Sequence, residues 1–211
     1  MAECTGPLTS PVGDPEAVAH DVVMAHIALF HSILGRRSVE HLAVERWRRA
    51  GHEAVAVDLF DGATAAGIDD GFALIDRIGW DTVVDNGRRG LADMPDETVL
   101  AGLSMGTGVV CELLPERPGT AGILLLHAFP ELPAGVTTGL RAQVHVAEPD
   151  EFARSGQLPS LRQAAEDADM AMEIFRYQGA GHFYIDRDLP DYDPEATELT
   201  WRRMLTFLDG S

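Results

Sequence analysis

Basic residues and cysteines are scarce in this chain. Its 211 residues include 34 acidic and 16 basic residues, which give a net charge of −18. Such a surface repels phosphate backbones and anionic lipid headgroups, so we expect neither a nucleic acid partner nor docking on an anionic membrane. The two cysteines, Cys4 and Cys111, fall in a predicted tail and a predicted helix. This placement argues against a structural disulfide and against a cysteine-based zinc site.

Signals for secretion, membrane insertion and metal binding are also missing. The first ten residues, MAECTGPLTS, lack the basic stretch and apolar run of a signal peptide. The longest apolar runs, 22–30 and 123–126, are too short to span a bilayer. No HExxH pattern and no EF-hand loop occurs, so we expect no metal, and no GxGxxG opens a helix after the first strand. We therefore expect a cytoplasmic protein, as a monomer or a small homo-oligomer, whose partner is a small molecule.

What the chain does contain is a regular alternation of short apolar runs and amphipathic stretches. Residues 1–20 are rich in Pro, Gly, Ser and Thr and predict a loose arm, followed by a single domain over 21–211. Strands are predicted at 22–30, 54–59, 98–103, 121–126, 142–147 and 173–177. Helices are predicted at 38–50, in two pieces within 69–92 that break at Gly79, and at 105–114, 158–170 and 194–208. Ser38 and Asp193 are the expected caps of the first and last helices.

This alternation predicts the α/β class, with a mostly parallel sheet of about six or seven strands and helices on both faces. In such sheets the ligand site lies outside the carboxyl ends of the strands.

A G-x-S-x-G motif lies at one of these strand ends. Gly102-Leu103-Ser104-Met105-Gly106 follows an apolar strand and opens a helix of small residues. A serine on such a sharp strand-to-helix turn is strained and exposed, and the flanking glycines leave room for the turn. The motif predicts Ser104 as a nucleophile and the backbone N–H of Met105 as an oxyanion donor.

A serine nucleophile needs a histidine base and an acid that orients it, here expected in the order serine, acid, histidine. His182 follows the sixth strand in a glycine-rich loop and is the expected base. His127 and His145, in or after strands, are more typical of core or supporting residues. The acid should follow the fifth strand, where Asp150 is favoured over Glu148 and both remain candidates. Five further histidines precede Ser104 and have the wrong order: His20, His26, His31, His41 and His52.

A second oxyanion donor is expected in the loop after the first strand, where we predict the backbone N–H of Ile33. Cys111 lies seven residues after Ser104 on the same predicted helix, about 10 Å away along the helix axis. It is predicted to be a packed core residue and not a nucleophile.

With these pieces in place, the sequence resembles the dienelactone hydrolase family over residues 24–209. The matching segments are LFHSILG, AGHEAVAVDLFDG, AGLSMGTGVV, ILLLHAF, QVHVAEPDEF and YQGAGHFYIDRDLPDYD. The resemblance implies an α/β-hydrolase fold without a cap domain and without a cofactor. It also implies Ser104, Asp150 and His182 as the triad, with Ile33 and Met105 as oxyanion donors.

Two departures from the family bear on the substrate. The best-known members use a cysteine nucleophile where this chain has Ser104. They also bind a substrate carboxylate through arginines, for which Arg187 is the candidate in this chain, and His31 is a second candidate substrate contact. The reaction class therefore transfers better than the substrate. The chain also looks short on the N-terminal side of the sheet.

These observations predict a serine hydrolase that cleaves a small carboxylic ester or lactone through an acyl-enzyme. Two alternatives remain open. The same triad could serve an acyltransferase or a peptidase, and the scaffold could carry a non-catalytic ligand-binding module.

Overall fold

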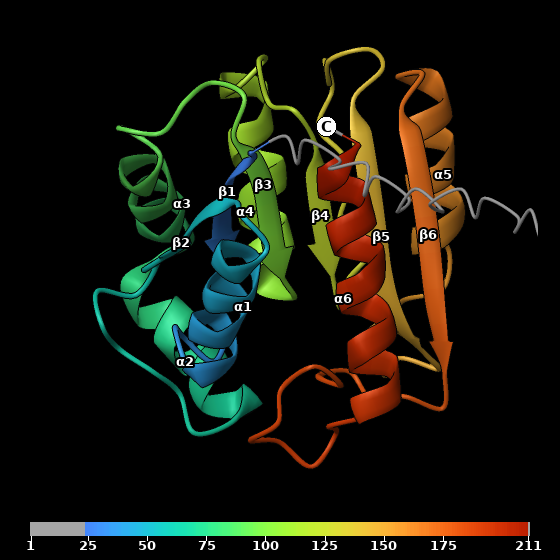
Figure 1. Cartoon of the computed structure of the whole chain (residues 1–211). Helices are drawn as coiled ribbons and strands as arrows, with labels where there is room; N and C mark the ends of the chain where they lie inside the picture. Colours follow the sequence, from blue (N-terminus) through green and yellow to red (C-terminus); the bar gives the residue numbers. More distant parts are fainter. Residues whose placement is uncertain (1–23, 211) are drawn as a thin grey trace, which may run out of the picture.

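A parallel sheet of six strands forms the centre of the molecule (Figure 1). The computed structural model describes residues 24–210, so the predicted arm at 1–20 lies outside the described residues. The strand order is β2-β1-β3-β4-β5-β6, and every neighbouring pair is parallel. The strands are β1 His26–Phe30, β2 Glu53–Val57, β3 Val99–Leu103, β4 Ile123–Leu126, β5 Arg141–Glu148 and β6 Ala171–Gln178.

Helices cover both faces of this sheet, as the alternating pattern predicts. Helices α1 and α6 lie on the face turned toward the viewer in Figure 1. The other helices contribute to the core on the opposite face. The helices are α1 Ser38–Arg49, α2 Ile68–Ile78, α3 Trp80–Gly90, α4 Met105–Leu113, α5 Gln157–Asp167 and α6 Pro194–Asp209, with a short 3-10 turn at Leu114–Glu116.

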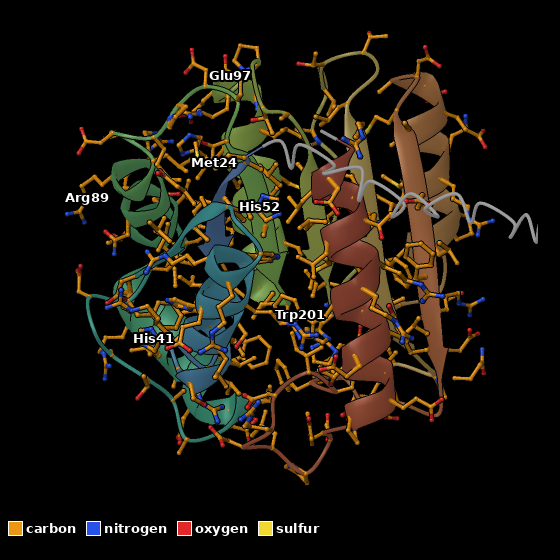
Figure 2. The ribbon with its side chains drawn as sticks, in the orientation of Figure 1. Met24, His41, His52, Arg89, Glu97 and Trp201 are labelled. Atoms are coloured by element: carbon orange, nitrogen blue, oxygen red, sulfur yellow. The ribbon has the colours of Figure 1, made fainter. Side chains whose placement is uncertain are left out.

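Each face of the sheet carries its own hydrophobic core. On the first face the indole rings of Trp47 in α1 and Trp201 in α6 meet edge to face, with centroids 5.6 Å apart. Figure 2 places Trp201 between these two helices. On the other face the core centres on Phe30, Val109 and Leu125. Every residue of β3 and β4 is buried, which matches their unbroken apolar sequence.

The helix ends confirm two expectations and correct one. Asp193 caps α6, because its Oδ1 accepts the N–H groups of Glu195 and Ala196 at 2.9 and 3.0 Å. Gly79, at φ 86°, separates α2 from α3 as predicted. Ser38 is not the cap of α1 but its first residue, and Arg37 holds the cap position. There Glu40 accepts the Arg37 N–H at 2.7 Å, so the carboxylate satisfies a free N–H at the helix start.

The element boundaries differ from the prediction by a few residues. Strands β5 and β6 are longer than predicted, because they pair over their whole length from Arg141 with Ala171 to Glu148 with Gln178. Strand β4 is two residues shorter at its start. No helix among residues 24–210 is long and apolar enough to cross a membrane.

All six strands run in the same direction, so their carboxyl ends lie together at one end of the sheet, at the bottom of Figure 1. The segments that follow β1, β3, β5 and β6 leave from this end, and they contain Ile33, Ser104, Asp150 and His182.

Candidate active site

Ser104 occupies a sharp turn between β3 and α4. Its backbone has φ 49° and ψ −109°, a conformation that non-glycine residues rarely adopt. The turn is held by the Ser104 N–H, which donates to the Leu126 carbonyl at 2.7 Å, and by the Thr107 N–H and hydroxyl, which donate to the Ser104 carbonyl at 3.0 and 2.7 Å. Strain of this kind persists only where the surrounding structure enforces it.

The two glycines of the motif allow this turn to pack tightly. A Cβ atom at Gly102 would lie 2.5 Å from the backbone of Gly106, and one at Gly106 would collide with the carbonyl oxygen of Phe30. Helix α4 therefore starts directly against the ends of β1 and β3, with its N-terminus at Ser104.

The structure brings Ser104, His182 and Asp150 into one hydrogen-bonded chain. Ser104 Oγ lies 3.0 Å from His182 Nε2. His182 Nδ1 lies 2.8 and 3.0 Å from the two carboxylate oxygens of Asp150. Both the His182 and the Asp150 side chains are only 3% exposed. An Nδ1–H that donates to the carboxylate leaves Nε2 free to accept the serine proton.

Glu148, the alternative acid, has other partners. Its carboxylate accepts hydrogen bonds from Arg176 and Gln178, both on β6. Since β6 lies beside β5 along its whole length, Glu148 is held at the carboxyl end of β5 by these partners and does not bond to His182.

The two expected oxyanion donors lie in a shared apolar cluster. Ile33 and Leu34 pack with Phe183, the neighbour of His182, and Met105 packs against this cluster. Among the hydrogen bonds of residues 24–210, none uses the N–H of Ile33 or of Met105. Both N–H groups therefore remain available to an external acceptor.

The imidazole of His31 is fully buried, and both ring nitrogens have partners. Nδ1 lies 2.7 Å from the Ser32 carbonyl, and Nε2 accepts the Leu59 N–H at 3.0 Å. Burial lowers the pKa of His31 to about 4, so the ring is neutral and uses one donor and one acceptor. A buried ring without a free polar atom has nothing to offer a substrate. We therefore interpret His31 as a support for the loop after β1.

Arg187, the other candidate substrate contact, is exposed. It lines a groove between α1 and α6 together with Arg46 and Trp201. None of the triad positions lines this groove, and within the described residues no hydrogen bond or ion pair joins Arg187 to the triad.

His127 is the most unusual residue beside the triad. It is 1% exposed, has φ 67°, and its ring centroid lies 5.7 Å from that of His182. Within the described residues neither of its ring nitrogens has a hydrogen-bond partner. Burial, followed by the proximity of His182 and His145, lowers the pKa of His127 well below its usual value. It therefore stays neutral beside the candidate base.

His145 is a satisfied core residue. Its Nδ1 lies 2.8 Å from the Tyr177 hydroxyl and its Nε2 lies 3.1 Å from Oε1 of Gln143. Burial, followed by the charge of Arg203, lowers the pKa of His145 to about 3.

Cys111 is also buried, and burial raises its thiol pKa to about 12, as expected for a packed residue that is not a nucleophile.

Two residues with unusual surroundings were not predicted from the sequence. The ring of Phe152 meets that of His182 edge to face, with centroids 4.5 Å apart, although Phe152 is 41% exposed. Its position two residues after Asp150 is the only signal in the sequence. Glu40 is fully buried, and burial raises its pKa to about 7. Nothing in the helical pattern of 38–50 distinguishes Glu40 from a solvent-exposed glutamate.

Comparison with known proteins assigns the chain to a family. The family model of the dienelactone hydrolase family matches residues 12–210. The chain belongs to the dienelactone hydrolase family. A comparison with curated protein sequences finds no significant match.

Solved structures share the fold of this dienelactone hydrolase family member. A dienelactone hydrolase-like promiscuous phosphotriesterase from metagenomic libraries superposes with a TM-score of 0.69 at 16% identity, covering 88% of this chain and 86% of that chain. A Klebsiella pneumoniae protein assigned as a dienelactone hydrolase gives 0.69 at 16% identity, with 90% and 89% covered. An esterase from Thermogutta terrifontis gives 0.55 at 14% identity, with 93% and 86% covered. The chain has the α/β-hydrolase fold, and its described residues show no cap domain.

Proposed function

We propose that this member of the dienelactone hydrolase family cleaves small carboxylic esters or lactones through an acyl-enzyme on Ser104. The observation that supports the proposal is the chain of short distances from Ser104 Oγ to His182 Nε2 and from His182 Nδ1 to the Asp150 carboxylate. A hydroxyl with a base at 3.0 Å and a base with a buried carboxylate partner is the arrangement that activates a serine.

The first half-reaction forms the acyl-enzyme. His182 Nε2 takes the Ser104 proton while Oγ attacks the ester carbonyl carbon, and the carbonyl oxygen becomes an oxyanion. The N–H groups of Ile33 and Met105 donate to this oxygen, and each is worth about 3 kcal/mol in the transition state. The bond to the leaving alkoxide then breaks, and that oxygen takes the proton from His182. In a lactone the leaving oxygen remains attached to the acyl group.

The second half-reaction releases the acid. Water takes the place of the leaving group, and His182 removes its proton as the water oxygen attacks the acyl carbon. Collapse of this second intermediate breaks the bond to Ser104 Oγ, which recovers its proton from His182. Asp150 holds the imidazole in the tautomer that both steps need and stabilises its transient positive charge.

Labelling with a fluorophosphonate probe tests the proposal. Intact mass and peptide mapping should show one adduct, on Ser104, and Ser104→Ala should lose both the adduct and the hydrolysis of p-nitrophenyl acetate. Ser160→Ala, which changes an exposed serine on α5, is the matched control and should keep both. An unlabelled but folded wild type would overturn the assignment and favour a non-catalytic binding module. Undiminished hydrolysis by Ser104→Ala would also overturn the assignment, because the reaction would then not depend on Ser104. Competing alcohols and amines in the product assay would reveal an acyltransferase, and a peptide substrate would reveal a peptidase.

A further inference from the structure

The loop that carries Ile33 is attached to one neighbouring segment. We call residues 31–35 the oxyanion loop and residues 59–71 the β2–α2 segment. The Leu59 N–H donates to His31 Nε2 at 3.0 Å, and the Ala65 N–H donates to the Leu34 carbonyl at 3.0 Å. Gly35 and Thr64 also form an isolated antiparallel bridge. The oxyanion loop is thus bonded to the β2–α2 segment at its start and at its end.

Between these bonds, Gly71 touches the middle of the oxyanion loop. Gly71 is a buried residue within α2, which runs from Ile68 to Ile78. A Cβ atom built on Gly71 would lie 2.7 Å from the Ile33 carbonyl oxygen and 2.8 Å from Ile33 Cγ1. The backbone of α2 therefore rests directly on the backbone of Ile33.

A glycine inside a helix is otherwise unfavourable, because only proline is a poorer helix former. The left-handed conformation does not explain this glycine either, since Gly71 has no positive φ. Gly67, at the start of the same helix, has open space around it, and a Cβ there would meet nothing within 4 Å. Gly67 is the N-cap and has an extended backbone, whereas Gly71 lies inside the helix, and of the two only Gly71 contacts Ile33.

The contact matters because oxyanion donors act over a narrow range of distances. An ordinary contact needs about 3.4 Å, so a methyl group at position 71 would push the Ile33 carbonyl away by roughly 0.7 Å, the difference from 2.7 Å. The Ile33 N–H is joined to that carbonyl through a single Cα atom and would move with it. A useful donor lies about 2.7–3.1 Å from the oxyanion, so a shift of this size removes most of its effect.

We propose that the β2–α2 segment positions the oxyanion donor, and that the absence of a side chain at Gly71 sets the place of the Ile33 N–H. Gly71 is a positioning residue in this scheme, since it acts through Ile33 and touches no substrate. The inference rests on the proposed function for its effect on turnover, whereas the position of the loop can be measured independently.

Gly71→Ala and its control Gly67→Ala test the inference. With p-nitrophenyl acetate, Gly71→Ala should lower kcat about 10- to 100-fold and leave KM within about threefold, because the donor acts mainly in the transition state. Its rate of fluorophosphonate labelling should fall in parallel. Gly67→Ala should stay within about threefold of wild type in kcat, KM and labelling rate.

The position of the Ile33 N–H is read from its ¹H–¹⁵N resonance, which should shift in Gly71→Ala and not in Gly67→Ala. An unchanged resonance, or a kcat equal to that of Gly67→Ala, would overturn the inference. If wild type shows no Ser104-dependent turnover, the proposed function fails, while the resonance still decides whether Gly71 places the loop.

Should Gly71→Ala not fold, His31→Phe tests the same attachment at the other end of the loop. The phenyl ring keeps the edge-to-face contact with Phe60, at 4.7 Å between centroids, but cannot accept the Leu59 N–H. It should lower kcat and leave KM nearly unchanged, and His31→Gln, which restores an acceptor, should recover part of the loss. Wild-type kinetics in His31→Phe would overturn the inference.

Discussion

The carboxylate of Asp150 lies 2.8 Å from His182 Nδ1, whereas Glu148, two residues earlier, is bonded to Arg176 and Gln178. The two acids compete for one role in the sequence, and the structure gives them different partners. The Asp150 side chain is nearly inaccessible to water, while the Glu148 side chain is 24% exposed and lies at the carboxyl end of β5. A buried carboxylate next to an imidazole orients the ring far better than a hydrated one.

Asp150→Asn should therefore abolish most of the activity. An amide cannot hold the imidazole in the required tautomer, and kcat should fall about 10³- to 10⁴-fold, as when the acid of other serine hydrolase triads is changed. Glu148→Gln, the matched control, should reduce kcat less than about threefold, because its partners lie on β6 and not on His182. Steady-state ester hydrolysis checks both variants. A larger loss in Glu148→Gln than in Asp150→Asn would reverse the assignment of the acid.

Much of the fold was predictable because its signals are local. The apolar runs, the break at Gly79 and the Asp193 cap each depend on a few neighbouring residues, and the structure contains all of them. Ser38 was mispredicted as a cap because serine is a common cap, while a carboxylate three residues after Arg37 performs the task. A single sequence does not show which of two nearby polar side chains will bond to a helix start.

In the candidate site, too, the features with local sequence signals were predictable and those that depend on packing were not. Chain order and the glycines of the G-x-S-x-G motif point to Ser104 and His182, whose Oγ and Nε2 atoms the structure places 3.0 Å apart. The contact of Gly71 with Ile33 and the unpartnered ring of His127 depend on packing between elements distant in sequence. No periodicity or motif encodes such contacts, so they became visible only in the structure.

The glycines of the G-x-S-x-G motif provide a prediction about stability. Gly106→Ala should destabilise the fold by more than about 3 kcal/mol, because the new methyl group meets the Phe30 and His31 carbonyls, which belong to β1 and the loop after it. Gly108→Ala, two residues further into α4, meets only the Trp80 ring at 3.3 Å. That flexible contact and the better helix propensity of alanine should keep the change within about 1 kcal/mol.

Urea unfolding followed by circular dichroism measures both variants. Equal midpoints for Gly106→Ala and Gly108→Ala would contradict the tight approach of α4 to β1.

Glu40 provides a prediction with a defined pH dependence. Its pKa is about 7 in the folded state against 4.5 as the ordinary value, so between these pH values the folded protein binds a proton that the unfolded chain has lost. Stability from this group is therefore full below pH 4.5 and falls as the pH rises to 7. Glu40→Gln keeps an acceptor for the Arg37 N–H and removes the free-energy cost of ionising a buried carboxyl group. It should match wild type near pH 4.5 and exceed it by about 3 kcal/mol at pH 8.

Glu45→Gln, on an exposed position of the same helix, is the control for this comparison and should show no such divergence. Urea titrations at several pH values give the free energies of unfolding. A constant difference between Glu40→Gln and wild type from pH 4.5 to 8 would contradict the buried state of Glu40.

The buried histidines have the opposite dependence on pH. The pKa values of His31 and His145 are lowered to about 4 and about 3 from 6.5. Below pH 6.5 the unfolded chain therefore binds protons that the folded protein does not bind, and the free energy of unfolding falls as the pH drops. Each such proton contributes a slope of about 1.4 kcal/mol per pH unit.

His145→Phe separates this slope from packing effects. The variant leaves the Tyr177 hydroxyl and Gln143 without their partner, so it should be less stable than wild type at pH 7. Its free energy of unfolding should nevertheless fall less steeply from pH 6.5 to 4.5, by about 1.4 kcal/mol per pH unit, because one proton uptake is gone. The offset at pH 7 reports the lost hydrogen bonds, and the slope reports the proton alone. Parallel curves for the two proteins would show that His145 is protonated in the folded state, contrary to its burial.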